Sequence, residues 1–134
     1  MKNEFAFVKE SGSDFSSTCL ALRQAVEKAG WAFMGGYDFG ETLAAKGFPQ
    51  GGAYRTFDIC HAKHANTMLG VEPLISMCMP CNISVFESNG KVIVATVRPS
   101  VMMPAVFGEA MSPVLGILAV IDDELSAILD SAAQ

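Results

Sequence analysis

The sequence feature that most constrains the fold is the pair Asn89-Gly90, which lies between two runs rich in β-branched and aromatic residues. The flanking runs read NISVFES and KVIVATV. An Asn-Gly pair in this setting is typical of a two-residue type I′ β-hairpin. The register of that hairpin places Ser88 opposite Lys91, Phe86 opposite Ile93, Val85 opposite Val94 and Cys81 opposite Arg98. We therefore expect an antiparallel pair of strands in this part of the chain.

The rest of the chain alternates between predicted strands and predicted helices. Further strands are expected at 4–9, 31–39 and 53–60. Helices are expected from Ser13 or Asp14 to Gly30, at 39–46, at 61–70, around 101–107, and from a Ser112 cap to about 131. No linker or internal repeat divides the sequence, so residues 1–134 are predicted to form a single domain. This order of elements favours a two-layer α+β fold, with an antiparallel sheet of four to six strands and helices on one face.

Two of these helices have a clear apolar stripe. In the first, the stripe consists of Phe15, Cys19, Leu22, Val26 and Ala29. In the last, it consists of Val114, Ile117, Leu118, Ile121, Leu125, Ile128 and Leu129. Leu115 and Val120 lie off the second stripe. Their apolar surface fits either a flank covered by a loop or the contact of a homodimer, and both are compatible with the pattern.

Composition limits the classes of function. Among 134 residues, 51% are hydrophobic and 17% are charged, which indicates a compact globular chain. The net charge is −5 and no basic stripe is present, which argues against nucleic-acid binding. The N-terminus lacks the apolar core of a signal peptide, and the longest apolar run, 113–121, is about half of what spans a bilayer. We therefore expect a cytoplasmic protein without a membrane span, in which cysteines are free, redox-active or metal-bound.

The segment MCMPC, residues 77–81, is the first candidate for chemistry. Cys78 and Cys81 form a Cys-x-x-Cys pair, but a strand follows Cys81 where a thioredoxin-like site would have a helix. The two side chains converge only if the chain turns at Met79-Pro80. Arg98, opposite Cys81 in the predicted register, would lower the pKa of the thiol, so Cys81 is predicted to be the most reactive cysteine. The alternative is that Cys81 is a small buried apolar residue at the start of a strand.

The second candidate is the segment Cys60-His61-Ala62-Lys63-His64. His61 and His64 lie on one face of the predicted helix, and thiolate with imidazole is a ligand set for zinc or copper. Thioethers in the chain favour Cu(I); the methionines concerned are 77, 79, 102 and 103. The alternative is that the histidines are exposed and the methionines fill the core. Nothing in the sequence indicates that residues 60–64 lie near residues 78–81. A catalytic pair, Cys60 with His64 or Cys81 with His61, also stays open.

Other catalytic chemistry has little support. The chain has no Gly-x-Ser-x-Gly nucleophile motif. The run Asp122-Asp123-Glu124 is interpreted as the solvated face of the last helix.

The segment MPCNISVFESNGKVIVATVRP resembles the bacterial and archaeal family called domain of unknown function 302. The matching positions are Met79, Pro80, Cys81, Ile83, Ser84, Val85, Glu87, Gly90 and Lys91, and upstream Cys60 and Pro73 also match. The resemblance covers about residues 4–131. It implies a small fold similar to half of the TATA-binding-protein saddle and a homodimer, without DNA binding and without an established activity. This chain departs from the family pattern at Asn82, where a basic residue is usual, at Cys78, and at His61-Ala62, where Asn-Pro is common.

Two functions from different classes are compatible with the sequence, and whether the protein is an enzyme stays open. In the first, Cys81 and Cys60, helped by Cys78, bind a soft metal or small ligand or act in thiol redox chemistry, with Arg98 holding the thiolate. A metal, Cu(I) or zinc, would take its ligands from Cys60, His61, His64, Cys78 and Cys81. In the second, the chain is a non-enzymatic homodimeric binding or scaffold protein whose cysteines are structural.

Overall fold

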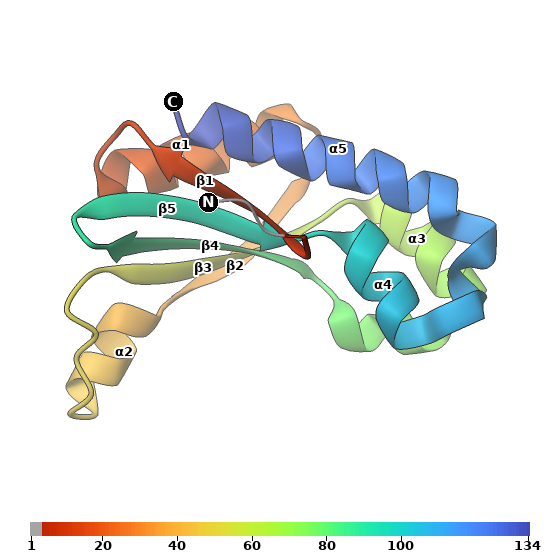
Figure 1. Ribbon diagram of the computed structural model, residues 1–134, viewed down its shortest axis with the longest axis horizontal. Coiled ribbons are helices and arrows are strands. Elements are labelled where there is room, and N and C mark those ends of the chain that lie inside the picture. The colour runs from red at the N-terminus through yellow and green to blue at the C-terminus, as the bar shows by residue number, and fades with distance from the viewer. Residues whose placement is uncertain (1–3) are drawn as a thin grey trace.

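The computed structural model describes residues 4–134, and its centre is a five-stranded antiparallel sheet (Figure 1). The strands lie in the order β1-β5-β4-β3-β2. Their bounds are Ala6–Ser11 (β1), Ala32–Asp38 (β2), Tyr54–Cys60 (β3), Cys81–Ser88 (β4) and Lys91–Val97 (β5). The helices α1 and α5 lie side by side over one face of this sheet. The predicted α+β fold is therefore confirmed.

The helices agree with the expected positions in most cases. They are α1 (Phe15–Lys28), α2 (Phe39–Ala45), α3 (Ala62–Val71), α4 (Pro99–Phe107) and α5 (Leu115–Ala132), with two 3-10 helices, η1 (Pro73–Cys78) and η2 (Gly108–Val114). Residues 1–3 of the predicted single domain lie outside the described part of the chain.

The predicted hairpin is confirmed together with its register. Ser88 pairs with Lys91, and further along Val85 pairs with Val94. Asn89 and Gly90 both have positive φ, of 52° and 75°, as a type I′ turn requires. The ladder between β4 and β5 ends at the pair of Ile83 with Thr96, two pairs before the predicted contact of Cys81 with Arg98.

The predicted start of α1 is also confirmed. The Asp14 carboxylate accepts a hydrogen bond from the Ser17 amide at 2.7 Å, which satisfies one free N–H at the helix start. Leu22 and Val26 are fully buried, as the stripe predicted, whereas Ala29 at the end of the stripe is exposed. Gly30 follows with φ of 82° and ends the helix.

The predicted start of the last helix is wrong. Ser112 and Pro113 do not cap an α-helix, because both lie inside the 3-10 helix η2, and α5 begins at Leu115. The stripe itself is correct, since its central residues Leu118 and Leu125 are fully buried. Leu115 and Val120 are exposed, so no loop within the described residues covers this flank, and of the two alternatives the homodimer contact stays a prediction.

The core fills the space between the sheet and the pair α1 and α5. Alternate residues of the central strands point into it, which is why Ile83, Val85 and Val94 are fully buried. The helices contribute Leu22, Val26, Leu118, Leu125 and Leu129.

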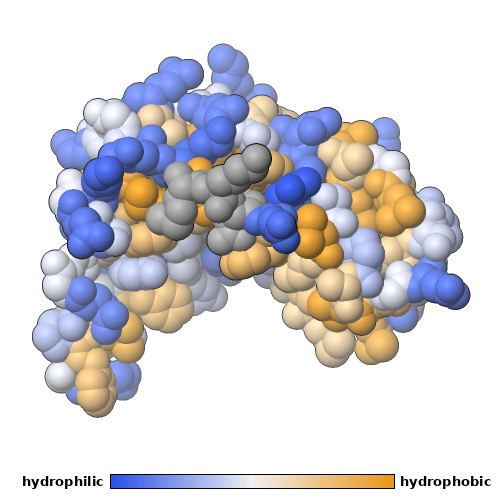
Figure 2. Space-filling view, viewed as in Figure 1, coloured by the Kyte–Doolittle hydropathy of each residue, from blue (hydrophilic) through white to orange (hydrophobic). Residues whose placement is uncertain are grey.

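The helices α1 and α5 both cover the same face of the sheet, and they leave the second face uncovered. It forms the underside of an arch, with α2 at one end and α4 with η1 at the other (Figures 1 and 2). Tyr54 of β3 stacks there on Phe86 of β4, with ring centroids 5.0 Å apart. At the α4 end this face has a groove of about 400 Å³, which Asn82 and Met102 help to line.

Strand β2 forms one edge of the sheet and is irregular. Its pairing with β3 shifts between Phe33 and Gly35. The strand continues through this bulge to Asp38.

One segment, Pro99–Ala132, is long and apolar enough to cross a bilayer by length and composition alone. In the fold it consists of α4, η2 and α5 in succession, and α5 contributes its buried stripe to the core. The expected absence of a membrane span stays a prediction.

Candidate functional site

Three of the four cysteines line one small cavity at the end of the sheet where α3, α4 and η1 lie. The cavity has a volume of about 50 Å³. Cys60 ends β3, Cys78 ends η1 and Cys81 begins β4. The sequence did not indicate that these segments meet. They do so because β3 and β4 are neighbours in the sheet, with Cys81 paired to Ile59.

The other cavity walls consist of thioethers, imidazoles and apolar side chains. Thioethers come from Met68, Met79 and Met103, and the imidazoles of His61 and His64 complete the donor set. The remaining walls come mainly from Trp31, Ile59, Ile75, Leu118 and Ile121. None of the lining residues carries a fixed positive or negative charge. The cavity therefore offers soft donor atoms in a setting that does not stabilise an isolated anion.

The predicted contact between Arg98 and the Cys81 thiol is wrong. The Arg98 guanidinium donates from Nε to Asp122 Oδ2 at 3.2 Å and from Nη1 to the Glu4 carbonyl at 3.3 Å. It also lies over the Phe7 ring. The reason is Asp122, which is almost completely buried in α5 and needs a cationic partner.

The predicted low pKa of Cys81 is wrong for the same reason. Burial, followed by the nearby Cys60 thiol, raises the pKa of Cys81 from 9.0 to about 11. Desolvation disfavours the thiolate, and the Arg98 guanidinium, which is bound to Asp122, does not offset this effect. Cys81 is consequently a neutral thiol at neutral pH.

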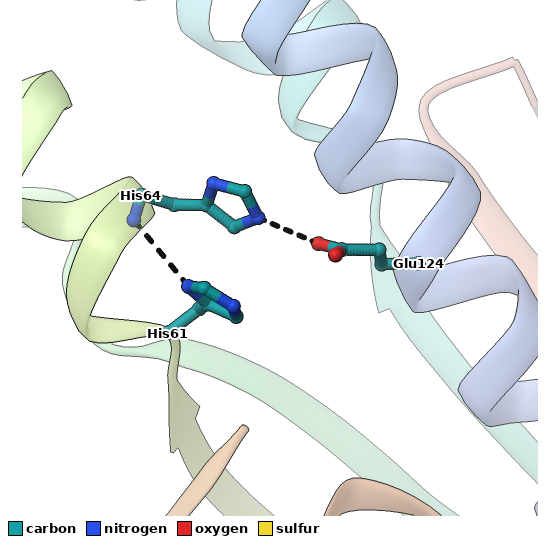
Figure 3. Close-up of side chains that lie close together, drawn as sticks. All are labelled: His61, His64 and Glu124. Carbon is teal, nitrogen blue, oxygen red and sulfur yellow. Dashed lines mark hydrogen bonds and ion pairs between the residues drawn. The ribbon is translucent and has the colours of Figure 1, made fainter. Parts of the chain in front are cut away.

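His61, His64 and Glu124 form a second cluster beside the cavity (Figure 3). His61 caps α3, and its Nδ1 accepts a hydrogen bond of 3.4 Å from the His64 amide. The two imidazole rings stack with centroids 4.0 Å apart. His64 Nε2 lies 2.7 Å from Glu124 Oε2, which comes from α5.

The predicted ligand set thus divides into two parts. One ligand atom from each of His61, His64 and Glu124 lies within 4.8 Å of the others, and within residues 4–134 this is the one such group of three. Cys60, Cys78 and Cys81, all in the described part of the chain, line a common cavity but do not form a group of that closeness.

Glu124 is a site residue that the sequence pattern did not indicate, because the whole acidic run was interpreted as solvated. Asp122 in that run is buried and Glu124 is half-buried, so only Asp123 is exposed. A signal was present, because position 124 lies three residues after the buried Ile121 and directly before the buried Leu125.

Comparison with known proteins now places the chain in a family. The model of the family described as domain of unknown function DUF302 matches residues 7–132. The chain belongs to the DUF302 family. The predicted resemblance is therefore confirmed. No curated protein matches the chain.

A solved structure has the same fold. It is the uncharacterized conserved protein DUF302 from Bacillus stearothermophilus, with a TM-score of 0.89 and 20% sequence identity. The alignment covers 98% of this chain and 100% of the other. At this identity the similarity shows the DUF302 fold and carries no statement about the site.

Proposed function

We propose that this DUF302 domain binds a soft monovalent cation, Cu(I), in the thiol cavity, with Cys60 and Cys81 as the main ligands. The observation that carries the proposal is the convergence of three cysteines and three methionines on one cavity without a charged wall. Thiolate and thioether donors favour Cu(I), whereas carboxylates and water would favour harder cations.

The charge of the ion and the state of the thiols also support copper. A single positive charge in an apolar cavity costs less desolvation than a double one, and one thiolate is enough to neutralise it. Cys60 lies close enough to raise the pKa of Cys81, so two neighbouring thiols are available. Zinc in a structural site takes four closely spaced ligands, and the sulfurs of Cys60, Cys78 and Cys81 do not form such a group among the described residues.

Thiol redox catalysis is less well supported. The attacking species in thiol chemistry is the thiolate, and burial keeps Cys81 protonated at neutral pH by raising the pKa of its thiol. A cation that displaces the proton removes this cost, because metal binding releases the proton from the ligand.

The groove on the open face of the sheet adjoins the thiol cavity. The groove on that face shares Cys78, Pro80, Cys81 and Met103 with the cavity walls. A copper donor would therefore approach from the concave side of the arch.

The test is competition for Cu(I) against a chromogenic chelator under reducing, anaerobic conditions. We expect one Cu(I) per chain, with affinity reduced at least about tenfold in Cys60→Ser and in Cys81→Ser. Cys19→Ser is the matched control, because Cys19 lies on α1 outside the cavity. If the chain takes no copper from the chelator, or if Cys19→Ser loses as much affinity as Cys81→Ser, the proposal is wrong.

The competing function is a scaffold protein whose cysteines only pack. The burial of Cys81 favours it. In that case Cys81→Ala changes the free energy of unfolding, and the wild-type chain binds no Cu(I).

A further inference from the structure

We propose that His61, His64 and Glu124 form a second metal site, specific for a divalent cation of the zinc class, which uses none of the cysteines of the thiol cavity. The site joins the first turn of α3 to the middle of α5. Two imidazoles and one carboxylate are a ligand set that zinc uses in proteins, and three protein ligands leave a fourth position for water.

The distances between ligand atoms are close to those that zinc requires. With bonds of about 2.0–2.1 Å in a tetrahedron, neighbouring ligand atoms lie about 3.3 Å apart. Here His64 Nε2 and Glu124 Oε2 are 2.7 Å apart, and no two of the three ligand atoms are more than 4.8 Å apart. Side-chain movements of roughly 1 Å are enough to reach the metal geometry.

Existing interactions at the cluster are easily replaced by a cation. The hydrogen bond from the His64 amide to His61 Nδ1 is 3.4 Å long, beyond the usual range for a strong bond. The hydrogen bond between His64 Nε2 and Glu124 Oε2 joins the same two atoms that a metal would bind. Figure 3 shows that both imidazoles extend from α3 towards the side of α5 that carries Glu124.

The surroundings hold the ligands in place. Trp31, which is buried, contacts both imidazoles, with ring centroids 5.6 Å from His61 and 6.1 Å from His64. Glu124 is held by α5, in which the nearby side chains of Ile121 and Leu125 are buried in the core. Rigid support of this kind is what keeps a metal site within the geometry it needs.

The site has its own route to solvent. His64 also lines a groove of about 380 Å³ on the outer side of α3 and α5, together with Lys63, Thr67 and Val120. This groove shares His64 with the thiol cavity but none of its cysteines. A hydrated divalent cation in this groove therefore meets His64, and the groove contains none of the cysteines.

The experiment is calorimetric titration of the full chain with Zn²⁺, supported by Co²⁺ absorption spectroscopy. We expect one Zn²⁺ per chain, affinity reduced at least about tenfold in Glu124→Gln, and affinity changed less than about twofold in Asp123→Asn. Asp123→Asn is the matched control because it removes the same charge from the adjacent, exposed position. Glu124→Gln keeps a hydrogen-bonding side chain beside His64, so the fold should persist.

Cobalt separates this site from the thiol cavity. We expect a visible d–d spectrum without the ultraviolet charge-transfer band of a cobalt–thiolate bond, and the same spectrum in Cys60→Ser/Cys81→Ser. A thiolate band that this double variant removes would overturn the proposal. So would the absence of zinc binding, or equal losses in Glu124→Gln and Asp123→Asn. Failure of Cu(I) binding would leave this result unchanged.

Discussion

At the scale of single residues, the fold strongly changes the acidity of the Cys81 thiol. Its pKa is about 11 in the folded chain, compared with 9.0 for an unperturbed thiol. The unfolded chain therefore loses this proton first as the pH rises. The contribution of the protonated Cys81 thiol to the free energy of unfolding is fully present below pH 9. It is lost progressively as the pH rises towards 11.

This difference between the two pKa values predicts that ionisation of Cys81 destabilises the fold at alkaline pH. Between pH 8 and pH 11 the wild-type chain should lose about 2–3 kcal/mol more of its free energy of unfolding than Cys81→Ala. Urea unfolding of both proteins across this range measures the difference. Parallel pH profiles for the two proteins would show that the pKa of Cys81 is the same in the folded and the unfolded chain, which would contradict the prediction.

A second residue-scale prediction concerns Asp122. Its carboxylate accepts hydrogen bonds from Arg98 and from the Ser100 amide, and it is almost completely buried. Asp122→Ala removes the one carboxylate that neutralises the Arg98 guanidinium in this part of the described chain, so we expect a loss of about 3–5 kcal/mol in urea unfolding. Asp123→Ala, at the adjacent exposed position, should change the value by less than about 0.5 kcal/mol. Similar effects of both substitutions would contradict this role.

The same residues show why sequence reasoning failed at this scale. The hairpin register placed Arg98 near Cys81, but a guanidinium turns towards the strongest acceptor in reach. That acceptor, Asp122, lies 24 residues away and on another element. Glu124 was missed for a related reason, since its partner His64 is 60 residues distant.

At the scale of secondary-structure elements, glycine has opposite effects at two positions. Gly90 lies in the hairpin turn with φ of 75°, whereas Gly116 lies in α5 with open space where an added methyl group would lie. Gly90→Ala should cost about 1–2 kcal/mol, because an L side chain strains that backbone. Gly116→Ala should add about 0.5–1 kcal/mol, because alanine favours the helix. Thermal unfolding of the two variants checks the pair, and a shift of the same sign in both would refute the explanation.

Elements were predictable where their signals are local. The Asn89-Gly90 turn and the Asp14 cap each depend on a few adjacent residues, and both are confirmed. The start of α5 was not predictable, because Pro113 fits a 3-10 turn as well as an α-helix start. The packing of η2 decides between the two. The meeting of Cys60 with Cys81 was also beyond the sequence, because it depends on which strands pair.

At the scale of the whole molecule, α5 has an exposed apolar flank. Leu115 and Val120 are each about half exposed, at 53% and 49%. We expect this flank to form the contact of a homodimer, which was one of the two alternatives that the sequence left open. Leu115→Lys/Val120→Lys should shift sedimentation towards the monomer, while Ala127→Lys, nearer the end of α5, should not. A wild-type chain that sediments as a monomer would exclude this contact.

The bulge in β2 has a consequence for the behaviour of the protein in concentrated solution. An outer strand with evenly spaced free amides and carbonyls is a template on which foreign strands can grow. The register shift between Phe33 and Gly35 disturbs that spacing on the rim of the sheet. Growth into fibrils from this rim is therefore hindered, even though Met34 beside it is apolar and exposed.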